Sequence, residues 1–238
     1  MIFYYVRHGD PIYEPDSLTE LGHKQANALS KRFALYGLDQ IYCSTSNRAM
    51  LTAEPTCKLL NKEKVLLPWT NEGYIWNFCS VDKDDLGNKC WIFFNKKYRD
   101  LFNSPEIRAL GDDWCSHPDI PQNLKDGVKI INKEVDDFML SLGFKHDRVN
   151  STFTKVSSGP APERVALFAH EGCGKMFLSS LLDMPYPYVS THLELGHSSV
   201  TTIYIPEDCE RPRIMQWSND SHLYKEGVLS AYQNWIDL

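Results

Sequence analysis

The first strand and the residues directly after it constrain this chain more than any other feature. Residues 2–6 read Ile-Phe-Tyr-Tyr-Val and run into Arg7-His8-Gly9-Asp10. A continuous run of apolar, β-branched and aromatic residues is typical of a strand in a parallel sheet that is buried on both faces, and Gly9 ends it. A guanidinium and an imidazole therefore leave this strand side by side. Open α/β sheets place their ligand crevice at that carboxyl edge.

The next segment predicts two helices with a short strand between them. A helix is expected to begin at Ser17 or Thr19, to carry apolar residues at helical spacing, and to end at Gly37. A short strand at residues 39–43 then leads, through a run of capping residues, into a second helix. Arg48 lies in the first turn of that helix. Each unit thus delivers an arginine near the end of a strand.

A later segment repeats this geometry. Residues 165–169 form another continuous apolar strand, which is followed by His170-Glu171-Gly172 and a helix from about 173 to 182. Pro55 predicts a kink or a break in the earlier Arg48 helix. The alternation predicts an α/β fold with a doubly wound, mostly parallel sheet and helices on both faces, in three α/β/α layers.

The middle of the chain has a different character. Ten aromatic residues crowd between Trp69 and Trp114, and Cys90, Phe94, Tyr98 and Leu101 fit one helical face. We interpret the chain as a single domain over 1–238 with an inserted helical cap at about 73–130, most of whose aromatic side chains lie in the core.

Several other elements have clear local signals. They are an amphipathic helix at 124–142, a loop or exposed hairpin at 145–161, strands at 201–205 and 213–217, and a closing helix at 224–235.

Composition excludes several classes of function. The chain has 238 residues, 42% of them hydrophobic, and a net charge of -6, which disfavours binding to nucleic acids or to membrane surfaces. Its seven cysteines form no CxxC pair and suit neither a disulfide framework nor a zinc site. Because no signal-peptide pattern precedes Arg7 and no apolar run reaches about 18 residues, we expect a cytoplasmic protein. The sequence carries no signal for an oligomeric state.

Four side chains are predicted to share one crevice: Arg7, His8, Arg48 and His170. Two guanidiniums and two imidazoles suit a phosphate, because an arginine fork binds its oxygens bidentately and remains charged. A histidine in such a site can attack phosphorus while the other groups offset the charge of the equatorial oxygens. No metal spacing is present, and we expect neither a metal nor a cofactor.

Together, four motifs resemble the histidine phosphatase superfamily in its phosphoglycerate-mutase-like branch. The resemblance covers roughly residues 1–72 and 164–205. The motifs are Arg7-His8-Gly9, Leu18-Thr19-Glu20-Leu21-Gly22 with Gln25-Ala26, Ser44-Thr45-Ser46-Asn47-Arg48-Ala49 with Thr52-Ala53-Glu54, and Ala169-His170-Glu171-Gly172.

This resemblance implies a role for each matching residue. His8 is the phosphorylated nucleophile, and Arg7, Arg48 and His170 hold the phosphoryl group. A proton donor is expected after a third short strand predicted at residues 65–68, where Glu72 fits. Burial among aromatic residues would raise its pKa. Glu171 is the rival donor, because a carboxylate beside the second histidine is similar to the acid-phosphatase branch.

Three functions remain open at this point. The favoured one is a metal-independent phosphatase that hydrolyses a small phosphorylated molecule, a phosphomonoester, through a phosphohistidine on His8. The alternatives are phosphoryl transfer of the phosphoglycerate mutase type and a non-catalytic module that binds a phosphorylated ligand. The pattern expected of the mutases after Arg7-His8-Gly9 is missing. The remaining histidines, His197 among them, are expected to be structural or exposed.

Overall fold

The computed structural model describes residues 1–83, 86–156, 159 and 161–230, and a six-stranded sheet forms its centre. In spatial order the strands are β12 (Arg213–Asn219), β11 (Val200–Tyr204), β1 (Ile2–Arg7), β10 (Arg164–Ala169), β4 (Gln40–Cys43) and β5 (Lys64–Leu66). β1, β10, β4 and β5 are parallel, whereas β11 and β12 are antiparallel to their neighbours. The predicted α/β fold with a mostly parallel sheet is confirmed.

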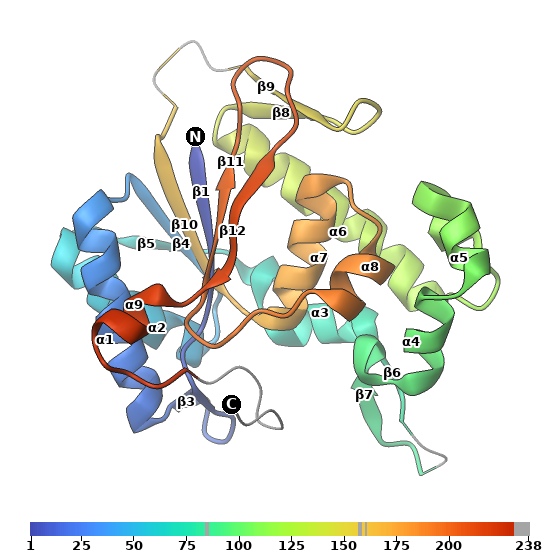
Figure 1. Cartoon of the computed structure of the whole chain (residues 1–238), viewed down its shortest axis with the longest axis horizontal. Helices are drawn as coiled ribbons and strands as arrows, with labels where there is room; N and C mark the ends of the chain where they lie inside the picture. The colour runs from blue at the N-terminus through green and yellow to red at the C-terminus, as the bar shows by residue number, and fades with distance from the viewer. Residues whose placement is uncertain (84–85, 157–158, 160, 231–238) are drawn as a thin grey trace.

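Helices cover both faces of this sheet (Figure 1), and the side chains of β1 alternate between them. Phe3 and Tyr5 stack on Phe177 of α7 (Glu171–Leu182), beside α6 (Gln122–Ser141). Tyr4 faces the other way and meets Phe33 of α1 (Glu20–Tyr36), which packs beside α2 (Asn47–Leu60). Because both faces are apolar and buried, β1 is fixed in the centre of the molecule and its carboxyl end is held rigidly.

The two N-terminal helices form for the expected local reasons, with one difference. Thr19, and not Ser17, caps α1, since its side chain accepts a hydrogen bond from the Gly22 amide. Gly37 ends α1 at φ +71°, in the region that favours glycine. α2 continues through Pro55 as a single helix, so the expected break does not occur.

The segment between β5 and α6 contains short elements. They are η1 (Pro68–Thr70), α3 (Glu72–Cys79), β6 (Ser80–Asp82), β7 (Lys89–Trp91), η2 (Ile92–Phe94), α4 (Lys96–Phe102), α5 (Pro105–Leu110) and η3 (Gly111–Ser116). The predicted single helical face is wrong, because Cys90 lies in β7 and Phe94 in η2. Phe93, Phe102 and Trp114 are buried in the main core cluster. A cap at about 73–130 remains our prediction for the domain organisation.

The remaining elements complete the layers. β2 (Pro11–Ile12) and β3 (Ser17–Leu18) form a small hairpin in the loop after β1, and β8 (Phe144–Asp147) and β9 (Thr152–Lys155) form the hairpin expected after α6. α8 (Tyr186–His192) was not predicted, and α9 spans only Ser221–Lys225.

The predicted closing helix is wrong at 226–230, because α9 ends at Lys225 and Gly227 adopts φ +65°. The rest of that prediction, 231–235, lies outside the described residues. Among the described helices, none combines the length and the apolar character needed to cross a membrane.

Candidate active site

The four predicted phosphate-binding side chains converge at the carboxyl edge of the sheet. Arg7 and His8 follow β1, His170 follows β10, and Arg48 lies at the start of α2 after β4. All four are buried, with His170 completely shielded and Arg48 the most exposed at 9%. The ring centroids of His8 and His170 are 5.1 Å apart. The strand order β1-β10-β4 makes this possible, since the three strands that carry these residues are adjacent and parallel.

One ring nitrogen of His8 is in a hydrogen bond. The other faces the space between Arg7, Arg48 and His170, which we call the phosphate cage. Its Nδ1 lies 2.7 Å from the carbonyl oxygen of Gly9, which can only accept, so Nδ1 carries the proton. Arg48 Nε donates to His8 Nε2 over 3.3 Å. Burial lowers the pKa of His8 well below its ordinary value, and the nearby His170, Arg7 and Arg48 lower it further. The imidazole is therefore neutral, with its lone pair on Nε2.

The backbone behind His8 is fixed by close packing against α1. A Cβ on Gly9 would lie 2.8 Å from the carbonyl oxygen of Gly22, which explains why glycine follows the histidine. The Gly9 amide donates to Thr52 Oγ1 over 2.9 Å. These contacts fix the position of the imidazole relative to Arg48, because Thr52 lies one turn after Arg48 on α2.

His170 is held at the opposite nitrogen. Its Nε2 lies 2.8 Å from Ser44 Oγ and 3.1 Å from Ser46 Oγ, so the Ser46 hydroxyl binds the imidazole and not the amides at the start of α2. Nδ1 is buried without a hydrogen bond to the described residues, and it lies 3.3 Å from Glu72 Oε2. Burial, followed by Arg48 and Arg7, lowers the pKa of His170 well below its usual range.

Glu72, at the start of α3, lies close to both histidines. Its Oε1 accepts a hydrogen bond from the Gly172 amide over 2.9 Å, and its Oε2 lies 3.6 Å from Arg48 Nη2. Burial raises the pKa of Glu72 to about 7, even though the two arginines act in the opposite direction. A Cβ on Gly172 would lie 2.7 Å from Glu72 Oε1, so glycine is required where this carboxyl group docks.

Glu171 occupies a different position from Glu72. Its Oε2 lies 3.1 Å from Arg7 Nη1, and its Oε1 lies 3.1 Å from Nζ of the fully buried Lys175. The Glu171 carboxyl group therefore contacts two cations. Glu72, by contrast, lies beside His170 and Arg48.

His197 belongs to the site although the sequence placed it among the structural or exposed histidines. It is 2% exposed, and its Nε2 lies 2.8 Å from Arg7 Nη2. An arginine can only donate, so Nε2 accepts and Nδ1 carries the ring proton, 3.5 Å from Asp10 Oδ1. Asp10 in turn accepts from Thr19 Oγ1 over 2.6 Å. Asp10 therefore lies beside His197.

The antiparallel pairing of β11 with β1 explains why His197 lies beside Arg7. Val6 pairs with Val200, so the residues before β11 come to lie beside the residues after β1. The Arg7 amide accordingly donates to Ser199 O, and the Ser198 amide donates to His8 O over 2.9 Å. The sequence alone did not give the direction of this strand.

The β2–β3 hairpin supplies two further contacts that the sequence did not predict. Asp16 Oδ1 lies 2.9 Å from Arg48 Nη1, and its Oδ2 accepts from the Asn47 amide. The Tyr13 ring lies 5.5 Å from the Arg48 guanidinium carbon. Asp16 and Tyr13 thus contact the outer side of the Arg48 guanidinium, while its Nε faces His8.

Three groups of this site are close enough to hold a metal ion. Ligand atoms of His8, Glu72 and His170 lie within 4.8 Å of one another. Two guanidiniums adjoin the same space, however, and they repel a cation and attract an anion. The chemistry of the donor set therefore favours a phosphate, and the arrangement can place a nucleophile, an acid and positive charge around one phosphorus atom.

Residues 3–73 match the sequence model of the histidine phosphatase superfamily (branch 1). Over this part, the chain is similar to members of that superfamily. The matched part contains Arg7, His8, Arg48 and Glu72, whereas the segment of His170 lies beyond it. No curated protein matches the chain.

Solved structures share its fold. Phosphoserine phosphatase from Entamoeba histolytica, in complex with 3-phosphoglyceric acid, is 17% identical with a TM-score of 0.56, over 93% of this chain and 98% of the other. A mycobacterial glucosyl-3-phosphoglycerate phosphatase is 19% identical with a TM-score of 0.57, over 91% and 98%. The alpha-ribazole phosphatase from Shigella flexneri is 16% identical with a TM-score of 0.56, over 92% and 97%.

Proposed function

We propose that this protein is a metal-independent phosphatase that hydrolyses a small phosphomonoester through a phosphohistidine on His8. The proposal rests on the protonation states of two groups, His8 and Glu72, in one buried site. His8 is neutral with Nε2 available, and Glu72 has a pKa of about 7, so a large part of it is protonated at neutral pH. A nucleophile and an acid with those properties are what transfer of a phosphoryl group from an alkoxide requires.

The first step forms the bond between nitrogen and phosphorus. The lone pair of His8 Nε2 attacks phosphorus, and the ester P–O bond breaks with its electrons moving to the leaving oxygen. Glu72 gives its proton to that oxygen. The proton on His8 Nδ1 stays on that nitrogen and is donated in a hydrogen bond to the Gly9 carbonyl oxygen, which keeps the ring in one tautomer throughout.

The second step reverses these roles with water. Glu72, now a carboxylate, removes a proton from a water molecule, whose oxygen attacks phosphorus. The P–N bond breaks, its electrons return to Nε2, and inorganic phosphate leaves. Arg7, Arg48 and His170 surround the phosphoryl group in both steps and offset the charge on its equatorial oxygens. We infer that His170 Nδ1, which is buried and has no hydrogen bond to the described residues, contacts one of these oxygens.

A labelling experiment tests this proposal. The protein is mixed with a ³²P-labelled phosphomonoester in the presence of a chelator and quenched within milliseconds. We expect acid-labile, base-stable label on a peptide that contains His8, together with released inorganic phosphate. The His8→Ala variant serves as the matched control and is expected to give neither.

Other outcomes of the same experiment identify the alternatives. Label on His8 with transfer to a second hydroxyl of the substrate, and without release of phosphate, would indicate a mutase. Tight binding of the ester with neither label nor phosphate would indicate a binding module. Activity that disappears with the chelator would contradict the metal-independent mechanism.

A further inference from the structure

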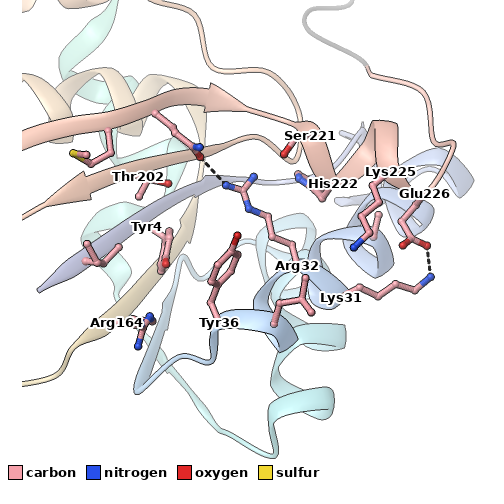
Figure 2. A pocket seen from close by; sticks show the side chains of 15 residues that line it. Tyr4, Lys31, Arg32, Tyr36, Arg164, Thr202, Ser221, His222, Lys225 and Glu226 are labelled. Atoms are coloured by element: carbon pink, nitrogen blue, oxygen red, sulfur yellow. Dashed lines mark hydrogen bonds and ion pairs between the residues drawn. The ribbon is translucent and has the colours of Figure 1, made fainter.

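A cavity lies away from the carboxyl edge of the sheet, beside β11 and the edge strand β12. It has a volume of about 580 Å³ and is bounded by α1, α9 and the first residues of β1. Figure 2 shows the side chains that line it, with Arg32 of α1 in its middle. None of the proposed active-site residues lines it. Its volume lies within the range of small-molecule sites, about 300–1,000 Å³.

The charge of this cavity is strongly positive, although the whole chain has a net charge of -6. Four cationic side chains and one carboxylate line it: Lys31, Arg32, Arg164, Lys225 and Glu226. Glu226 pairs with Lys31 at the rim. The cavity therefore keeps an excess of positive charge that an anionic ligand would offset.

Arg32 is the cation that most needs a counter-charge. Its guanidinium donates to Asn219 Oδ1 over 2.7 Å, to Asn219 O over 3.2 Å and to Gln216 Oε1 over 3.0 Å, all of them neutral oxygens. Within the described part of the chain no carboxylate forms an ion pair with it. Burial lowers the pKa of Arg32 below its usual value, against smaller opposing effects of Tyr36, Tyr4 and Asp220. Arg32 is thus a half-buried cation held in place by neutral groups.

Two other polar groups in the wall have unused hydrogen-bonding capacity. His222 is 4% exposed and Thr202 lies on β11, and both line the cavity. His222 Nε2 lies 3.1 Å from Ser198 Oγ, whereas its Nδ1 is buried without a hydrogen bond to the described residues, as is Thr202 Oγ1. Buried polar atoms of this kind normally have a partner. A ligand that entered the cavity could provide one.

The rest of the lining is apolar or aromatic. Tyr4, Leu35, Tyr36 and Met215 form walls around the Arg32 guanidinium, and Leu35, Tyr36 and Met215 are more than half exposed. Flat rings pack well on tyrosine faces, and an aliphatic rim suits an apolar body. The lining therefore combines one anchoring cation with surfaces for a ring system.

We propose that this cavity is a second binding site, which takes a small organic anion with a flat apolar body and pairs the anionic group with Arg32. The ring system of the ligand lies between Tyr36 and Met215. Polar atoms on the ligand meet His222 Nδ1 and Thr202 Oγ1. The site is independent of the phosphatase reaction proposed above, because it shares no residue with the phosphate cage.

The probe for this site is 8-anilinonaphthalene-1-sulfonate, which has one sulfonate and two ring systems and which fluoresces when it leaves water. We expect saturable binding to the wild-type protein. Arg32→Gln removes the charge and should raise the Kd roughly tenfold or more, the value of a charge-assisted hydrogen bond. Leu35→Glu, which places a carboxylate at the exposed rim, should also raise the Kd, and this variant changes no buried group.

Two control variants locate the bound dye. Lys129→Gln removes an exposed cation on α6, outside the cavity, and should leave the Kd unchanged. Arg48→Gln alters the phosphate cage and should also leave it unchanged. The proposal would be overturned by an absence of saturable binding, by equal Kd values for wild type, Arg32→Gln and Leu35→Glu, or by loss of binding in Arg48→Gln alone. Thermal unfolding of each variant checks that Arg32→Gln still holds α1 to β12.

Discussion

The ends of β1 and β10 have nearly the same local pattern, but they hold their histidines in opposite ways. Each is a buried parallel strand followed by a histidine at the sheet edge. After β1, a backbone carbonyl occupies Nδ1 of His8 and leaves Nε2 facing the cage. After β10, two serine hydroxyls occupy Nε2 of His170 and leave Nδ1 beside Glu72. The difference teaches that the partner of each ring decides which nitrogen faces the cage: the neighbouring Gly9 carbonyl for His8, and serines from another segment for His170.

Removing each histidine in turn should have the largest effect on activity and should separate the roles of the two strand ends. His8→Ala should eliminate both turnover and the phosphohistidine, a loss of at least about 10⁴-fold, because no other group forms the covalent bond. His170→Ala removes one contact to the phosphoryl oxygens and should cost about 10²–10³-fold in kcat. It should still give label on His8. The measurements are steady-state kinetics and quenched-flow labelling; label that survives in His8→Ala would reverse the two assignments.

Glu72→Gln tests the acid that lies between the two histidines. The acid must be protonated in the first step, and its pKa is about 7, so kcat for an alkyl phosphate should fall above pH 7, up to tenfold for each pH unit. In Glu72→Gln we expect a loss of about 10²-fold at pH 6 and no such fall, since the titrating group is absent.

An aryl phosphate provides the control for Glu72. Its leaving oxygen needs little protonation, so the substitution should affect its cleavage much less. Equal losses for alkyl and aryl esters, or an unchanged pH profile, would contradict the assignment of the acid. Glu171→Gln is the matched carboxyl variant and should keep the fall above pH 7.

Gly172→Ala should have a smaller effect that is specific to the β10 end. The added methyl group would lie 2.7 Å from both Glu72 Oε1 and Trp91 Cη2, so the carboxyl group and the indole ring must shift. We expect roughly a tenfold loss of kcat with alkyl phosphates, as for a modest displacement of a reacting group. Gly174→Ala is unsuitable as a control because it is also crowded, whereas Gly159→Ala, where the Cβ has no neighbour within 4 Å, tests general damage. A full loss of folding in Gly172→Ala, seen by circular dichroism, would remove this explanation.

The smallest effect is expected at the β1 end, from His197→Asn. The substitution removes the acceptor for Arg7 Nη2 but leaves Glu171 and the Leu195 carbonyl oxygen to hold Arg7. KM should rise a few-fold, about 1 kcal/mol in binding, while label on His8 persists. His197→Gln, whose amide oxygen can replace Nε2 as an acceptor, should restore part of the loss. A larger decrease in kcat than in His170→Ala would show that His197 acts directly on the reacting atoms.

The sequence predicts the parts of this molecule that depend on local patterns. Strand β1, its glycine and the caps of α1 follow from residue type and spacing, and they place Arg7, His8, Arg48 and His170 at one edge of the sheet. The orientations within the cage do not follow, because they depend on contacts between residues far apart in the chain, such as Gly172 with Glu72. The aromatic segment is hard to predict for a related reason: its short helices and its hairpin are stabilised by packing on the main core, and helical spacing alone was misleading at Cys90 and Phe94.

The Ser46 hydroxyl, which binds His170 instead of capping α2, links folding stability to catalysis in one atom. A serine at that position would ordinarily stabilise its helix by about 1 kcal/mol through the first amides. Here Asp16 serves the Asn47 amide instead, from a hairpin on the other side of Arg48. A variant in which this hydroxyl capped α2 would have a more stable helix but would lose the hydrogen bond to the His170 imidazole. Selection for heat resistance and selection for turnover are therefore expected to favour different partners for Ser46.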